Sequence, residues 1–167
     1  MRIDVVSGDL TALEVDAIVT AANAALRGGG GVDGAVHRAA GPRLLAACRE
    51  IGGCPTGTAV VTPAFDLEPR VRWVVHAVGP VWSGAPDDAD LLTGAYRDAL
   101  RCADEVGARS IAFPAISTGV YGYPKDEAAA VSVAALRGAT TSVEQVLLCA
   151  FDAGTARLWE QALQQDG

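Results

Sequence analysis

Six short apolar runs constrain the fold of this chain more than any other feature, because most are continuously apolar rather than alternating. They are Ile3–Val6, Ala17–Thr20, Thr58–Thr62, Trp73–Val78, Ser110–Phe113 and Gln145–Ala150. A strand that is apolar at successive positions is covered on both of its faces, as in a sheet that lies between layers of helices. The runs therefore predict a sheet that is buried on both sides.

Helical segments lie between these runs. Apolar residues recur at three- and four-residue steps over 91–106, which predicts an amphipathic helix that ends at Gly107. Further helices are predicted over 34–51 with an interruption at Gly41-Pro42, over 127–137, and after Asp152 as an N-cap. Strands that alternate with helices predict an α/β fold with a largely parallel sheet. We find no repeat and no linker, so we expect one domain over 1–167.

The charge balance excludes several kinds of partner. The formal net charge is −7, the sequence pI is about 4.7, and the chain has no run of Lys and Arg. Proteins that bind nucleic acid or an anionic membrane by charge usually present a basic face, so neither partner is expected. An anionic ligand must then be held mainly by backbone N–H groups.

The four cysteines show no metal-type spacing, and neither His37 nor His76 completes a zinc set in the sequence. The first residues lack the pattern of a secretory signal, and no apolar run has the length of a membrane span. We therefore expect a cytoplasmic protein with reduced cysteines, no metal and no cofactor.

A glycine-rich loop, 28–34, follows the second apolar run. Gly29, Gly31 and Gly34 match the dinucleotide pattern G-x-G-x-x-G, but eight residues separate the strand end from Gly29, the first glycine of the match, and no acidic strand end follows. This spacing disfavours a Rossmann oxidoreductase, and the chain has no P-loop motif. Successive glycines before a helix let backbone N–H groups approach an anion, although a flexible loop has the same composition.

Two polar residues near this loop are candidates for chemistry. Asp33 is either the N-cap of the following helix or a carboxylate that orients or activates a water beside a bound diphosphate. Asn23 is either a turn residue or an amide that contacts a ribose diol.

A second loop follows the strand that ends at Phe113. Its small and hydroxyl-bearing residues suit a phosphate and a sugar ring, unless the loop only connects to a helix at Pro124. The candidates are Ser117, Thr118, Gly119, Val120 and Tyr121. Asp9 and Phe151 each follow another predicted strand. Asp9 is either a turn residue or a carboxylate that accepts from the adenine amine. Phe151 is either a core residue or a ring that stacks on the base.

Several motifs in one order closely resemble the macrodomain family, in particular its MacroD-type subclass of O-acetyl-ADP-ribose deacetylases and mono-ADP-ribosyl hydrolases. The resemblance extends from about Ile3 to Leu163. The motifs are Gly8–Thr11, Val15–Val19, Ala21–Asn23, Gly28–Gly34 with Val36–Pro42, Cys54–Gly57, His76–Pro80 and Phe113–Pro124.

The resemblance implies a three-layer α/β/α fold around a mixed, largely parallel sheet. It implies that Asp9 reads the adenine amine, that the Leu10 backbone lines the base pocket, and that Phe151 flanks the base. The backbone of Gly30, Gly31 and Val32, with Ser117–Tyr121, would enclose the diphosphate and the distal ribose. Asn23 would contact that ribose, and Asp33 would be the catalytic carboxylate.

These roles predict hydrolysis of esters at the distal ribose of ADP-ribose, without a metal. The substrates would be O-acetyl-ADP-ribose or ADP-ribose on Asp and Glu side chains of proteins. One residue departs from the family, which usually has Asn where this chain has Thr20. We expect the departure to weaken activity and not to abolish it. The alternative is a reader module that binds ADP-ribose without turnover and needs no carboxylate at Asp33.

Overall fold

The computed structural model describes residues 1–165 and contains one mixed six-stranded sheet with the strand order β1-β6-β5-β2-β4-β3. Residues 166–167 of the predicted domain lie outside the described residues. The strands are β1 (Arg2–Ser7), β2 (Ala17–Ala21), β3 (Ala59–Pro63), β4 (Trp73–Ala77), β5 (Ser110–Phe113) and β6 (Gln145–Ala150). The helices are α1 (Gly31–Ala40), α2 (Pro42–Ile51), α3 (Asp88–Glu105), α4 (Lys125–Arg137) and α5 (Ala153–Gln164), with 3₁₀ turns η1 (Leu10–Ala12) and η2 (Phe65–Leu67).

The sheet is parallel except at one edge, where β3 runs antiparallel to β4. A short connection through η2 joins β3 to β4, whereas each parallel neighbour is reached by a longer crossover. All six predicted strands are present, and the prediction of a mixed, largely parallel sheet is confirmed.

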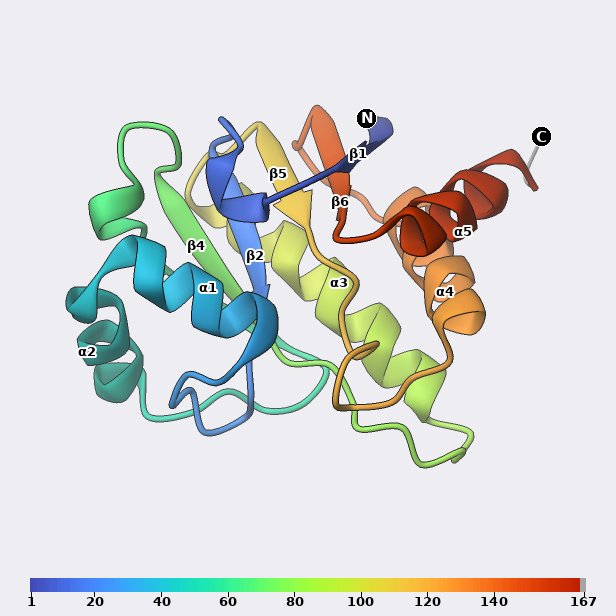
Figure 1. Ribbon diagram of the computed structural model, residues 1–167, viewed down its shortest axis with the longest axis horizontal. Helices are drawn as coiled ribbons and strands as arrows, with labels where there is room; N and C mark the ends of the chain where they lie inside the picture. The colour runs from blue at the N-terminus through green and yellow to red at the C-terminus, as the bar shows by residue number, and fades with distance from the viewer. Residues whose placement is uncertain (166–167) are drawn as a thin grey trace.

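Two hydrophobic cores explain why the strands are continuously apolar. On β2, Ala17 and Val19 pack into a core with α3, α4 and α5, while Ile18 between them packs into a core with α1 and α2. Figure 1 shows α1 beside α2 at one side of the molecule, and α4 beside α5 at the other. The strands β2, β4, β5 and β6 each bury residues in both cores, which confirms the three-layer α/β/α architecture.

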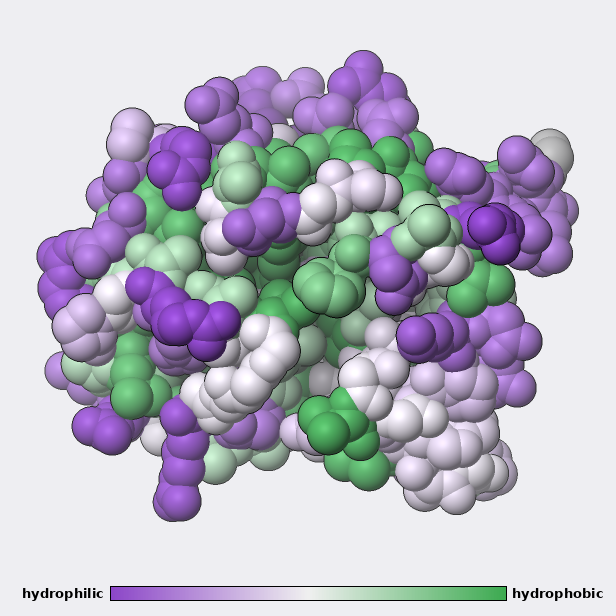
Figure 2. All heavy atoms as spheres, in the orientation of Figure 1, coloured by the Kyte–Doolittle hydropathy of each residue, from purple (hydrophilic) through white to green (hydrophobic). Residues whose placement is uncertain are grey.

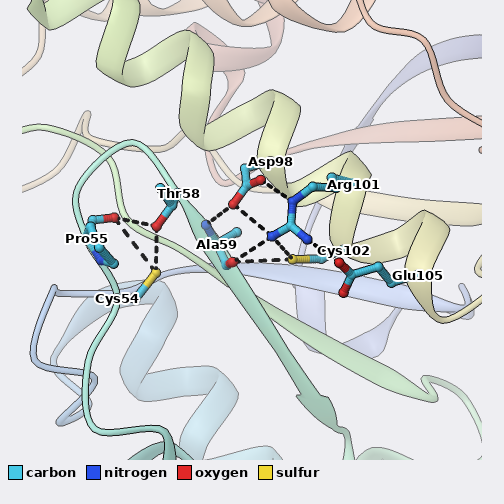
Figure 3. Close-up of polar contacts among 8 residues, drawn as sticks. All are labelled: Cys54, Pro55, Thr58, Ala59, Asp98, Arg101, Cys102 and Glu105. Carbon is cyan, nitrogen blue, oxygen red and sulfur yellow. Dashed lines mark hydrogen bonds and ion pairs between the residues drawn. The ribbon is translucent and has the colours of Figure 1, made fainter.

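The open edge of the sheet at β3 is covered by side chains of α3 (Figure 3). The Ala59 N–H donates to Asp98 Oδ2 at 2.7 Å, and the Ala59 carbonyl accepts from Cys102 Sγ at 3.4 Å. Arg101 forms ion pairs with both Asp98 and Glu105, which fixes this group on the helix. The outward backbone groups of Ala59 are thereby satisfied, so they are not available to pair with another strand.

Helix boundaries differ from the predictions mainly at the N-termini. The structure begins α1 at Gly31 instead of residue 34 and α3 at Asp88 instead of residue 91, while Pro42 lies in the first turn of α2 as predicted. Asp152 caps α5 by accepting from the Thr155 N–H at 2.7 Å, as predicted. Within residues 1–165 no helix combines the length and apolar character that crossing a membrane requires.

Candidate active site

A cleft of about 900 Å³ lies where the chain leaves β1, β5 and β6 and enters α1. The face seen in Figure 2 is hollowed between these elements. Parallel α/β sheets bind ligands at the carboxyl ends of their strands, and the volume is at the upper end of the range for small-molecule sites. This cleft is therefore the candidate active site.

Seven of the predicted site residues line the cleft, and six lie outside its lining. Those in the lining are Asp9, Leu10, Gly31, Val32, Thr118, Gly119 and Phe151. Those outside it are Asn23, Gly30, Asp33, Ser117, Val120 and Tyr121.

Other lining residues were not predicted. Ala35 and Arg38 follow Gly31 by four and seven residues, so they share one face of α1, and this periodicity is a signal that was available in the sequence. Lys125 and Thr155 come from the first turns of α4 and α5, and only the tertiary structure places them here.

Asp9 and Phe151 both border the cleft, as the adenine prediction requires. Asp9 Oδ1 accepts hydrogen bonds from the Thr11 N–H at 2.9 Å and from its hydroxyl at 2.7 Å, which makes Asp9 the N-cap of η1. The other carboxylate oxygen retains its capacity to accept from a ligand. Phe151 is 89% exposed, and is therefore a surface aromatic at the rim and not a core residue.

Asn23 braces the loop that leads to the glycines. Its Nδ2 donates to the Gly28 carbonyl at 2.9 Å, and its Oδ1 accepts from the Arg27 N–H at 3.1 Å. A carboxamide has two donors and two lone pairs, so one donor and one acceptor remain for a ribose. A Cβ built on Gly29 would lie 3.8 Å from Asp33 Oδ2 and 3.9 Å from Asn23 Nδ2. The two predicted catalytic side chains thus both lie close to Gly29.

Asp33 is the third residue of α1, whose N-cap is Gly30, so the interpretation of Asp33 as the N-cap was wrong. The side chain turns inward and is 5% exposed. Its Oδ1 accepts from the Thr20 hydroxyl at 2.8 Å and lies 3.7 Å from His37 Nε2. Burial raises the pKa of the Asp33 carboxyl, and the Thr20 hydrogen bond and His37 counteract part of that effect.

Thr20 therefore has a defined role in this structure. It is fully buried near the end of β2 and supplies a donor to Asp33. The hydroxyl of Thr20 provides one hydrogen bond at the position where the family usually has a carboxamide.

The second loop forms a tight turn at the strand end. Ser117 has φ +69, and its carbonyl accepts from the Tyr123 N–H at 2.9 Å. The Ser117 hydroxyl is buried without a hydrogen-bond partner among the described residues 1–165, and it packs so closely that a Cβ on Gly79 would lie 2.2 Å from it. The Tyr121 carbonyl accepts from the Trp82 N–H at 2.8 Å, which joins this loop to the segment before α3.

Neither histidine lines the cleft. His76 is fully buried in β4, as predicted for an apolar strand, and burial lowers its pKa to about 3. His37 is half-buried on α1, one turn after Asp33.

Known proteins show the same pattern over the length of the chain. The Macro domain family model matches residues 19–132. The chain is 53% identical to the O-acetyl-ADP-ribose deacetylase of Salmonella typhimurium, in an alignment that covers 99% of this chain and 96% of the relative. It is also 53% identical to a macro domain-containing protein of Streptomyces coelicolor over 90% of this chain and 92% of that protein.

Solved structures agree with this relationship. The Oceanobacillus iheyensis macrodomain with ADP superposes with a TM-score of 0.89 at 40% identity, covering 96% of this chain and 88% of that one. The Trypanosoma brucei macrodomain in complex with ADP-ribose gives a TM-score of 0.88 at 38% identity, with 97% of this chain and 69% of that chain covered. The chain belongs to the macro domain family.

Proposed function

We propose that this protein is a hydrolase that cleaves esters at the distal ribose of ADP-ribose, with O-acetyl-ADP-ribose as a substrate. The observation that carries the proposal is a buried carboxylate, Asp33, fixed by Thr20 at the start of the helix that borders the cleft. The name of the Salmonella relative, at 53% identity over nearly the whole chain, supports the same reaction. We extend the proposal to mono-ADP-ribose on Asp and Glu side chains, because the scissile bond is also an ester at the ribose.

The cleft offers distinct groups to the two ends of such a ligand. Asp9 and Phe151 suit adenine, since a carboxylate accepts from an exocyclic amine and an exposed ring stacks on a base. At the other end, the backbone of Gly30, Gly31 and Val32 would face the diphosphate at the N-terminus of α1, where N–H groups lack helical partners. The side chains of Arg38 and Lys125 add positive charge to the cleft lining.

The proposed chemistry uses one water and no metal or cofactor. Asp33 orients the water toward the acyl carbon, and Asn23, which also lies close to Gly29, positions the ribose. Attack forms the bond between the water oxygen and the acyl carbon, and the bond to the ribose oxygen breaks. One proton of the water ends on the ribose oxygen, so the products are ADP-ribose and a carboxylic acid. The carboxylate of Asp33 is the group that must be intact.

Replacing Asp33 tests this proposal. Asp33→Asn preserves the side-chain shape but removes the charge, so kcat for O-acetyl-ADP-ribose should fall by about 10²–10⁴-fold, with ADP-ribose affinity within about tenfold. Turnover is measured by release of ADP-ribose, and affinity by calorimetry. The matched control is Asp90→Asn, an exposed carboxylate in the first turn of α3.

Unchanged turnover in Asp33→Asn would overturn the catalytic assignment. Tight binding of ADP-ribose by the wild-type protein, with no release from either the acetyl ester or an ADP-ribosylated protein, would identify a reader module instead.

We place the protein in the cytoplasm, which the four unpaired, buried cysteines support.

A further inference from the structure

A second polar cluster lies next to Asp33, outside the cleft lining. It consists of His37 on α1, Cys48 on α2 and His76 on β4, which are far apart in the sequence. One ligand atom from each residue lies within 4.8 Å of the others. Two imidazoles and a thiol are the donors that zinc prefers in proteins.

The hydrogen bonds of His76 leave one ring nitrogen available to an ion. Thr62 Oγ1 lies 3.0 Å from His76 Nε2 and donates its single hydrogen to the Pro63 carbonyl at 3.1 Å. In the tautomer with the proton on Nε2, Thr62 accepts from that N–H, and Nδ1 carries a lone pair that an ion can use. A histidine that binds a metal usually donates its other N–H to a neighbour in this way.

The remaining groups lie close to the His76 ring. Cys48 Sγ lies 3.7 Å from His76 Nδ1 and 3.8 Å from Nε2, so the ring must turn for Nδ1 and the thiolate to share one ion. His37 Nε2 lies 3.7 Å from Asp33 Oδ1, which puts a carboxylate at the border of the cluster. Since Cys48 and His76 are fully buried, a bound ion would be held mostly away from solvent.

We propose that His37, Cys48 and His76 form a site for one Zn²⁺ ion, with a water as the fourth ligand. In tetrahedral zinc sites the ligand atoms are about 3.5 Å apart, so the cluster contracts by about 1 Å around the ion. Binding converts the Cys48 thiol to a thiolate and releases its proton to solvent. The site is separate from the proposed hydrolysis, in which no metal takes part.

Cobalt titration of the full chain tests this site without an activity assay. Co²⁺ replaces Zn²⁺ in such sites and gives a thiolate-to-cobalt charge-transfer band and visible d–d bands. We expect these bands to saturate at one ion per chain and to disappear on addition of Zn²⁺. In Cys48→Ser the charge-transfer band should be lost. Cys102→Ser, another buried and unpaired cysteine, should keep it.

Two further variants distinguish a metal site from a network of hydrogen bonds. Thr62→Val removes the partner of His76 Nε2 and should weaken Co²⁺ binding by about 10–100-fold while the band is retained. His76→Gln replaces a ligand if Cys48→Ser does not fold, as judged by circular dichroism, and should abolish saturable binding. The proposal is overturned if the wild-type protein gives no charge-transfer band, or if the band persists unchanged in Cys48→Ser or His76→Gln.

Discussion

Thr20 and Asp33 meet because β2 ends beside the first turn of α1. The hydroxyl donates to Asp33 Oδ1 at 2.8 Å, and both side chains are buried. Burial alone favours the neutral acid, whereas a hydrogen bond to the carboxylate favours the charged form. Thr20 therefore supports the ionised state and the orientation of Asp33 at the same time, and acts as a positioning residue.

Thr20→Val should lower kcat for O-acetyl-ADP-ribose by about 10–100-fold, because a hydrogen bond to a charged group contributes about 1.5–3 kcal/mol. Affinity for ADP-ribose, measured by calorimetry, should change little, since the proposed backbone contacts remain. Thr20→Ser retains the hydroxyl and should restore most of the turnover. If Thr20→Ser is as slow as Thr20→Val, the hydroxyl is not the group that matters.

At the scale of elements, the N-terminus of α1 combines two kinds of glycine. A Cβ on Gly34 would lie 2.6 Å from the Gly29 carbonyl oxygen, so the helix and the loop pack backbone to backbone there. A Cβ on Gly30 meets nothing within 4 Å, and its φ of −90 suits any residue. A side chain at position 34 would therefore disturb the fold itself. A side chain at position 30 would disturb only a ligand that approaches the backbone there.

Gly34→Ala should lower the free energy of unfolding by about 1–3 kcal/mol, because the added methyl forces the loop backbone to move. Gly30→Ala should leave that free energy within about 0.5 kcal/mol of the wild-type value, as expected for an exposed site, but should weaken ADP-ribose binding. Urea unfolding and calorimetry measure the two quantities. Equal effects of the two substitutions on stability would contradict this assignment.

The N-terminus of α3 is tied to the segment that precedes it by Asp88. Its carboxylate accepts from the N–H groups of Ser83 and Gly84, each at 3.0 Å, and from the Ser83 hydroxyl. The hydrogen bond from the Ser83 N–H, with those from the Ser83 hydroxyl and the Gly84 N–H, holds the pKa of the Asp88 carboxyl below its usual value. Trp82 precedes Ser83 in the chain, and its N–H donates a hydrogen bond to the Tyr121 carbonyl in the second loop. The Asp88 carboxylate therefore helps to hold the second loop in place.

This arrangement predicts a pH dependence. A carboxyl whose pKa is lower in the folded state stabilises the protein above its unfolded pKa of about 3.9, and the stabilisation is lost as the pH falls through the folded pKa. Asp88→Asn should therefore be less stable than the wild-type protein at pH 7, and the difference should shrink below about pH 4. Asp87→Asn is the control, since Asp87 makes no side-chain cap. A difference that stays constant between pH 7 and pH 3 would refute the interpretation.

At the scale of the whole molecule, α5 completes the larger of the two cores that enclose the sheet. Trp159 is 1% exposed and packs among residues of α3, α4 and the strands. Its Nε1 donates to Ser132 Oγ at 3.0 Å, and that hydroxyl donates to the Ala129 carbonyl at 2.8 Å. The indole thus fills the space between two helices without leaving its N–H unpaired.

Trp159→Ala should lower the free energy of unfolding by about 3–5 kcal/mol, because it leaves a cavity in this core. Trp82→Ala removes a side chain that is 37% exposed and should cost less. Guanidinium unfolding of the two variants provides the comparison. A cost for Trp159→Ala that does not exceed the cost for Trp82→Ala would show that α5 is not an integral part of the core.

Part of the candidate site was visible in the sequence, and the rest was not. The two loops, Asp9 and Phe151 became candidates because glycine, polar residues and an isolated aromatic occur in the segments that follow apolar strands. The start of α1 was placed too late, since glycine is a poor helix former. In the structure α1 begins at Gly31, and Asp33 in its first turn is buried against Thr20.

The six strands, the helices between them and the family could be predicted from the sequence, because these depend on local hydropathy and on motifs that are contiguous in the chain. Which side chains meet could not be predicted in this way, because it depends on how the elements pack. The register of β2 and β4 pairs Thr20 with His76, and α1 and α2 lie against them, so Asp33, His37 and Cys48 converge on this point. Such contacts depend on strand order and helix packing, which local periodicity does not specify.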